Sequence, residues 1–180
     1  IDSAYIKMVS PMVDVYKGAV EPERHLGIFA LYVSFFPQIL AGPIARAKQL
    51  MPQIRQNHRF NEQQVVSGLS LVLWGVFQKV VIADRLALLV NQVYDSPSEY
   101  QGLTILVATY FFWFQIYCDF AGYTSIARGV ARVFGFDLVK NFNRPYLSKD
   151  FNEFWNRWHI SLSNWLRDYI FFPIMRVFRR

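Results

Sequence analysis

Three long apolar runs constrain what this chain can fold into. They cover residues 26–45, 65–83 and 103–127, and each has about the 20 residues that a helix needs to cross a bilayer. Only 18% of the 180 residues are charged, and 53% are hydrophobic. This pattern favours membrane spans over the core of a soluble all-helical domain. Proline removes a backbone donor, so the first run is expected to bend or end near Pro37. The sequence predicts an all-α fold, a polytopic membrane helix bundle.

Charges between the runs predict which side of the membrane each connection occupies. Basic residues gather between the first and second runs and again after the third, whereas acids outnumber bases between the second and third. Basic connections stay in the cytoplasm, so Asp84 to Gly102 is expected outside and Arg128 to Asp150 inside. The net charge of +6 is then explained by topology and by anionic lipid, not by nucleic acid.

The third run contains an acid, Asp119, with Gln115 and Tyr123 at helical spacing. An ionised carboxylate in hydrocarbon is costly, so Asp119 is expected to face protein rather than lipid. Two interpretations follow. Asp119 lines a cavity as a substrate-binding anchor, or it forms a structural pair with a base such as Arg144 or Arg157.

Residues 151–172 show a different pattern, that of an amphipathic or re-entrant helix. At 100° per residue the large apolar side chains share one face, and Pro173 should disturb or end the helix. His159 lies at the border of that face, in a polar seam with three other residues. The apolar face holds Trp155, Trp158, Leu162, Trp165, Leu166 and Tyr169, and the seam holds Asn152, Asn156, His159 and Ser163.

His159 is the candidate catalytic residue. Partial burial keeps an imidazole neutral, so His159 could act as the general base that activates a hydroxyl, with a neighbouring Asn or Ser fixing its tautomer. The alternative is a structural histidine that satisfies both nitrogens at the helix border. His25 and His58 stand in polar flanks and are expected to be solvated. Cys118 is the only cysteine, and no metal site is expected.

Four stretches in order resemble the signatures of membrane-bound O-acyltransferases: "FFPQILAGPIAR", "GVFQKVVIADRLA", "QIYCDFAGYTSIARG" and "NFNRPYLSKDFNEFWNRWHISLSNWLRDY". The nearest subgroup is the alginate O-acetyltransferase type, with the D-alanyl-lipoteichoic acid exporter type as a near relative. The resemblance places the motif histidine at His159. It also implies a second histidine on a later helix, so residues 1–180 are expected to be a single membrane-embedded segment of a longer catalytic fold.

The resemblance implies a multi-pass enzyme of the bacterial inner membrane, which transfers acetyl groups toward hydroxyls of an exported polysaccharide such as alginate. The donor is expected to be an acyl thioester, acetyl-CoA, used as a substrate with no bound cofactor. Expected partners are the lipid bilayer, the polysaccharide acceptor, and periplasmic or extracellular acetylation proteins. D-Alanyl transfer to teichoic acid polymers is one alternative. A transporter or channel subunit with Asp119 and His159 in an ion path is another, although no inverted repeat is visible. The expected substrate-binding residues are Asp119, Trp155, Asn156, Trp158 and Ser163.

Overall fold

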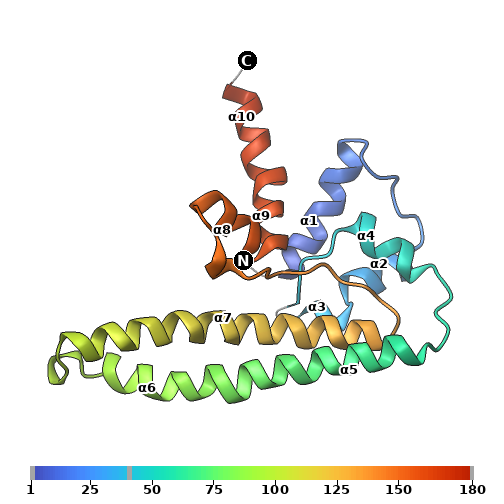
Figure 1. The fold of residues 1–180 in the computed structure, drawn as a ribbon. Helices are drawn as coiled ribbons and strands as arrows, with labels where there is room; N and C mark the ends of the chain where they lie inside the picture. The colour runs from blue at the N-terminus through green and yellow to red at the C-terminus, as the bar shows by residue number, and fades with distance from the viewer. Residues whose placement is uncertain (1–2, 40–41, 179–180) are drawn as a thin grey trace.

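The computed structural model describes residues 3–39 and 42–178, and all regular structure in these ranges is helical (Figure 1). The expected all-α class is therefore confirmed. The α-helices are α1 (Ser3–Tyr16), α2 (Leu26–Val33), α3 (Phe36–Ile39), α4 (Ala47–Ile54), α5 (Glu62–Val76), α6 (Asp84–Tyr94), α7 (Gly102–Val133), α8 (Phe151–Arg157), α9 (Ile160–Leu166) and α10 (Phe172–Phe178). Wider π-turns, η1 (Phe77–Ala83) and η4 (Arg167–Phe171), join α5 to α6 and α9 to α10, and two short 3₁₀ turns are η2 (Pro97–Glu99) and η3 (Pro145–Leu147).

Two long antiparallel helices form the base of the molecule. The first, Glu62–Tyr94, runs without interruption through α5, η1 and α6, and the second is α7. At 1.5 Å per residue each is about 50 Å long, more than enough to cross a membrane. Only 17% and 11% of their most apolar 18-residue stretches are buried inside the protein. The core helices of a soluble protein would be mostly buried, so this exposed apolar surface is consistent with contact to lipid.

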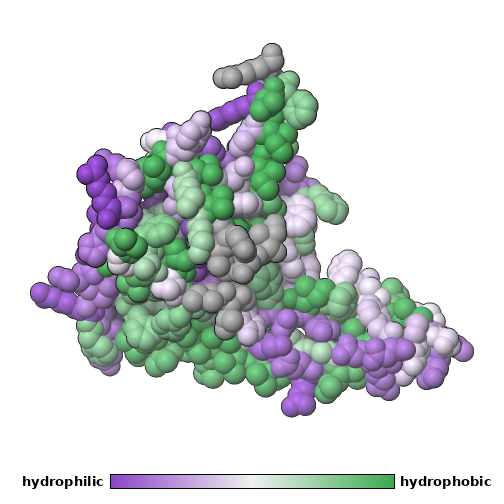
Figure 2. Space-filling model, turned by 180° about the vertical axis from the view of Figure 1, so that it is seen from behind, coloured by the Kyte–Doolittle hydropathy of each residue, from purple (hydrophilic) through white to green (hydrophobic). Residues whose placement is uncertain are grey.

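Hydrophobic side chains spread over this base. Seen from behind, green hydrophobic residues cover much of the lower half of the molecule, where the long helices lie (Figure 2). Leu69, Leu73 and Trp74 of the first long helix are each more than half exposed, and so are Trp113 and Phe114 of the second.

The two long helices approach closely at two pairs of glycines. Gly68 of α5 lies opposite Gly129 of α7, and Gly75 lies opposite Gly122. A Cβ added to Gly75 would lie 2.6 Å from the carbonyl oxygen of Gly122, and one added to Gly68 would lie 2.8 Å from that of Gly129. The absence of side chains at these positions lets the two backbones touch, as at the interfaces of membrane helices.

The remaining helices, α1 to α4 and α8 to α10, stand on one side of this hairpin (Figure 1). A small apolar core joins the segment from α2 to α4 to the C-terminal end of α7. It includes Tyr32, Phe35, Leu50, Ala131 and Leu138, all buried. The Tyr32 hydroxyl donates to the carbonyl oxygen of Ala45 at 3.2 Å, which ties the chain after α3 back to α2.

The first apolar run is not one spanning helix. It breaks after α2, at Ser34, and resumes as α3 with Pro37 in the first turn. Pro37 has no N–H to donate to the carbonyl of Val33, so the helix cannot continue, whereas proline is tolerated in a first turn. A helix end near Pro37 was expected, and that expectation is confirmed. The outcome is two short helices that contribute Tyr32 and Phe35 to the core.

The expectation that residues Asp84 to Gly102 form the connection between the second and third runs is largely wrong. Asp84–Tyr94 is α6, so the connection to α7 contains only residues 95–101. Asp84 does not end the helix because its carboxylate pairs with Lys79, one turn earlier on the same helix.

Residues 151–172 do not form one amphipathic helix. The chain leaves the helical conformation at Trp158 and His159, which separate α8 from α9. Pro173 disturbs the helix as expected but does not end it, because the π-turn η4 immediately before α10 accommodates the missing N–H.

Candidate active site

His159 occupies the break between α8 and α9 in a left-handed conformation, with φ 41° and ψ 52°. In the described residues, Arg144 is the only other non-glycine residue with positive φ. Such a conformation is costly for a residue with a Cβ, and it is concentrated at functional sites. The break therefore aims the imidazole in a direction that a continuous helix would not allow.

Two aromatic rings enclose the imidazole of His159. Phe120 of α7 lies with its ring centroid 4.7 Å away, and Phe142 lies 6.4 Å away, edge to face. Burial lowers the pKa of His159 from 6.5 to about 4. Its Nδ1 atom is buried, and no hydrogen-bond partner for it lies in the described part of the chain. The histidine is thus neutral near pH 7, and the alternative in which both nitrogens are satisfied is not supported.

The polar seam expected beside His159 is not formed. Asn152 and Asn156 lie on α8, where both are exposed, while Ser163 lies on α9 beyond the break. The Ser163 hydroxyl donates to the carbonyl of Trp158 at 3.1 Å, and the backbone N–H of Ser163 donates to the carbonyl of His159 at 3.0 Å. Ser163 therefore stabilises the break, and the structure does not bring Asn156 into contact with the imidazole.

The two tryptophans expected to wall a cavity have different environments. Trp158 is packed among rings, with Phe142 at 5.0 Å and Phe154 at 5.6 Å between centroids. Trp155 is 52% exposed on α8. An open groove of about 510 Å³ lies between α7 and α8, and we call it the aromatic groove. It is lined by Trp113, Ile116, Tyr146, Ser148, Lys149, Asp150, Phe151, Phe154 and Trp158.

The aromatic groove and His159 are neighbours but are separate. Trp158 lines the groove and packs against Phe142, which in turn packs against the imidazole. A ligand in the groove would thus be separated from His159 by these two rings. Trp155 is not part of the lining.

Asp119 pairs with Lys79 across the long-helix hairpin, with Nζ 2.6 Å from Oδ1. It therefore faces the neighbouring helix, but its partner is neither Arg144 nor Arg157. Arg157 instead pairs with Glu153, four residues earlier on α8. The ion pair supports the structural interpretation of Asp119, although the direct neighbour of Asp119 in sequence, Phe120, contacts His159.

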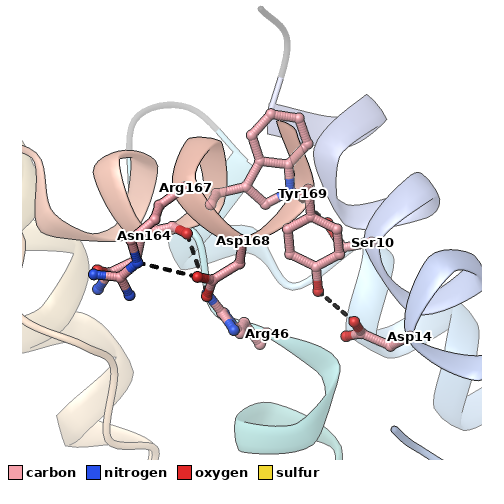
Figure 3. Close-up of polar contacts among 8 residues, drawn as sticks. Ser10, Asp14, Arg46, Asn164, Arg167, Asp168 and Tyr169 are labelled. Carbon is pink, nitrogen blue, oxygen red and sulfur yellow. Dashed lines mark hydrogen bonds and ion pairs between the residues drawn. The ribbon is translucent and has the colours of Figure 1, made fainter. Parts of the chain in front are cut away.

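A polar network fastens the helix after His159 to the N-terminal part of the chain (Figure 3). Asp168 accepts from Arg46 and lies 3.1 Å from Nε of Arg167. The Tyr169 hydroxyl donates to Asp14 of α1 at 2.7 Å. Trp165 also reaches α1, where its Nε1 donates to the hydroxyl of Ser10 at 2.8 Å. These contacts fix the direction in which α9 leaves the histidine.

Asn141 is a site residue that the sequence pattern did not single out. It is 1% exposed, and it binds the two backbone N–H groups that follow His159. Nothing in the sequence separates it from exposed neighbours such as Asn143. Across residues 3–39 and 42–178, no group of three His, Cys, Asp or Glu side chains is placed to hold a metal ion.

Comparison with known proteins gives one consistent result. A family model described as "MBOAT, membrane-bound O-acyltransferase family" matches residues 25–180. "Probable alginate O-acetylase AlgI" of Pseudomonas aeruginosa is 39% identical over 167 residues, covering 92% of this chain and 32% of that protein. "Peptidoglycan O-acetyltransferase" of Helicobacter pylori is 38% identical over 152 residues, covering 83% of this chain and 29% of that protein. "Teichoic acid D-alanyltransferase" of Bacillus subtilis is 30% identical over 167 residues, covering 92% of this chain and 42% of that protein. The chain thus spans less than half the length of each of these relatives.

Proposed function

Because the chain belongs to the membrane-bound O-acyltransferase family, we propose that it carries part of the active site of a polysaccharide O-acetyltransferase. The proposed enzyme is a multi-pass protein of the bacterial inner membrane. It moves an acetyl group from a thioester donor, acetyl-CoA, toward hydroxyls of an exported cell-surface polysaccharide, together with extracytoplasmic partner proteins. The observation that carries the proposal is the environment of His159, which has a left-handed backbone, a neutral ring and a buried unpaired nitrogen.

The chemistry assigned to His159 is general base catalysis. A neutral imidazole accepts the proton of the acceptor hydroxyl while the hydroxyl oxygen attacks the thioester carbonyl carbon. The carbon–sulfur bond then breaks, and the proton passes to the departing thiolate. A pKa of about 4 keeps His159 in the form that can accept a proton throughout the physiological range, at the cost of some basicity. The histidine acts alone or together with the second histidine that the family resemblance implies.

The aromatic groove suits the apolar part of the donor. Its wall of Trp, Phe and Tyr side chains ends at Lys149 and Asp150, so it offers an apolar bed with a charged rim. Binding the donor here requires Trp158 or Phe142 to turn before the thioester reaches the imidazole. Trp158 is therefore the proposed substrate-binding residue for which the structure offers most support, and Trp155, Asn156 and Ser163 have less. Asp119 is assigned to the Lys79 ion pair.

The acetyl donor is favoured over a D-alanyl donor by the comparisons. The relatives named as acetylating enzymes are 37–39% identical to this chain, against 30% for the D-alanyltransferase of Bacillus subtilis. A transporter is disfavoured because Asp119 is paired with Lys79 rather than directed along a path that also holds His159.

The test measures acyl transfer by the full-length protein in membranes, with radiolabelled acetyl-CoA and polysaccharide from the same cells. We expect His159→Ala and His159→Gln each to lower the rate by about 100-fold to 10,000-fold, because glutamine cannot accept a proton at neutral pH. His58→Ala is the matched control, since His58 is exposed and its imidazole contacts the carbonyl of Gln53 and the ring of Phe136, residues that make no described contact with His159. Normal transfer by a well-expressed His159→Ala protein would refute the base role. Transfer of D-alanine but not acetate would refute the donor.

A further inference from the structure

We propose that Asn141 is the positioning residue for His159. It holds the start of α9 from outside the helix, and in doing so it keeps His159 in the left-handed conformation that directs the imidazole toward Phe120. The value of that position for catalysis rests on the function proposed above, whereas the positioning itself does not.

Asn141 makes two hydrogen bonds at the same junction. Its backbone carbonyl oxygen accepts from the N–H of Ile160 at 2.9 Å, and its side-chain Oδ1 accepts from the N–H of Ser161 at 3.1 Å. The first N–H groups of any helix need acceptors from outside the helix. His159 occupies the position that normally supplies one, but its side chain makes no capping bond. A residue twenty positions earlier than Ser161 performs that task instead.

The alternative conformation is apparent from the sequence pattern. Residues 151–172 have the periodicity of one continuous amphipathic helix, and the break at His159 is all that prevents it. In a continuous helix the N–H groups of Ile160 and Ser161 would bond to carbonyls one turn earlier in α8. The bonds to Asn141 replace those partners, so they offset the cost of the left-handed residue.

The surroundings of Asn141 leave it little freedom. It is 1% exposed, and Phe142, next in the chain, packs on both Trp158 and His159. The Ser161 hydroxyl accepts from the N–H of Ile44, which holds the same turn from a third segment of the chain. Asn141 Nδ2 has no hydrogen-bond partner among the described residues. The part of the amide that acts on His159 is therefore the oxygen.

Two variants of nearly equal size separate the oxygen from the bulk of the side chain. Asn141→Asp keeps the acceptor for the Ser161 N–H, and Asn141→Leu fills the same space without it. Asn143→Leu is the matched control in the same segment, because the Asn143 side chain is exposed and accepts a hydrogen bond from the exposed Lys140 rather than from the start of α9. If Asn141→Leu does not fold, Asn141→Ala takes its place.

The first measurement is the proton NMR signal of the His159 ring in the full-length protein, assigned with His159→Gln. This signal would not change if Asn141 contributed only to overall stability. The ring of Phe120, 4.7 Å from the imidazole between centroids and tilted by 36° to it, should give this signal an upfield ring-current shift. Phe120→Leu should remove that shift and so provides the reference for its loss. We expect the shift to persist in Asn141→Asp and Asn143→Leu and to disappear in Asn141→Leu. A folded Asn141→Leu or Asn141→Ala protein that keeps the shift would overturn the proposal, and so would its loss in Asn141→Asp.

Kinetics provide the second readout. If the function proposed above is right, Asn141→Leu lowers kcat for acetyl transfer at least tenfold with KM for acetyl-CoA within about twofold, and Asn141→Asp restores most of kcat. Should His159→Ala turn out fully active, the proposed function fails while the ring-current result still decides the role of Asn141.

Discussion

Lys79 and Asp119 form an ion pair between the two long helices, with the lysine Nζ 2.6 Å from Oδ1 of the aspartate. The same ammonium lies 2.7 Å from Oδ1 of Asp84, so one lysine serves two carboxylates. Lys79 lies in the π-turn η1, whose wider helical path interrupts the regular α-helical spacing between α5 and α6. A charge placed in the apolar hairpin is thus accompanied by opposite charges from the same helix and from its neighbour.

Replacing Lys79 should show how much its pairing with the two aspartates contributes to stability. We expect Lys79→Met to lower the free energy of unfolding by about 1–3 kcal/mol, since Asp84 and Asp119, each about half exposed, lose their cation beside apolar side chains. The double variant Lys79→Met with Asp119→Asn should recover part of that loss. Thermal unfolding in detergent measures both variants, with Lys48→Met at an exposed position as the control. Equal melting temperatures for Lys79→Met and Lys48→Met would show that the ion pair contributes nothing.

The glycine pairs give a second prediction. Gly75→Ala places a Cβ 2.6 Å from the carbonyl oxygen of Gly122, so the two long helices must separate locally. We expect a loss of about 1–3 kcal/mol in unfolding free energy, as for overpacked interiors. Gly102→Ala, at the start of α7, is the control because an added Cβ there meets nothing within 4 Å. The comparison is again one of melting temperatures in detergent, and a Gly75→Ala protein as stable as Gly102→Ala would contradict the close approach.

Stability should also depend on pH through His159. Its pKa in the folded protein is about 4, below the 6.5 of an unperturbed histidine, so the unfolded chain takes up a proton before the folded protein does. The contribution of His159 to stability is therefore lost as pH falls from about 6.5 toward about 4. His159→Gln removes this term, so its melting temperature should fall less between pH 7 and pH 4.5 than that of the unmodified protein. An identical slope for both proteins would mean that His159 is not buried as described.

The sidedness of the two ends of the hairpin remains a prediction from charge. We expect the connection that contains Ser98 to lie outside and the segment that contains Ser148 to lie in the cytoplasm. Single cysteines at these positions, in a Cys118→Ser background, should react oppositely with an impermeant thiol reagent applied to intact cells. Labelling of both from outside would refute the assigned orientation.

The sequence predicted the parts of the fold that depend on composition and length. The second and third apolar runs became the two long helices because lipid requires continuous backbone hydrogen bonding over such lengths. The first run has similar composition, but Pro37 divides it and Tyr32 and Phe35 bury its pieces in a core that no local pattern indicates. Periodicity also could not show that the first long helix continues past Asp84 as α6, because the ion pair between Asp84 and Lys79 forms only once the helix exists.

The sequence pattern singled out His159, around which the candidate site is described, but it did not predict what surrounds this residue. His159 stood out because a histidine in an aromatic run is unusual in so apolar a chain. The helical wheel then grouped it with Asn156 and Ser163, since it assumed one continuous helix. Contacts with Asn141 break that helix, and they connect residues twenty positions apart, which periodicity cannot detect.

The two glycines on each long helix, Gly68 and Gly75 on one and Gly122 and Gly129 on the other, are seven residues apart, and this spacing determines which changes in length the hairpin tolerates. Gly68 and Gly75 meet their partners in register, so inserting one residue between them would rotate one glycine by about 100° away from the interface. A bulky neighbour would then replace it against α7. Side chains on the exposed apolar surface of the hairpin can vary in shape. Single-residue insertions or deletions within residues 68–75 or 122–129, by contrast, should not be accommodated.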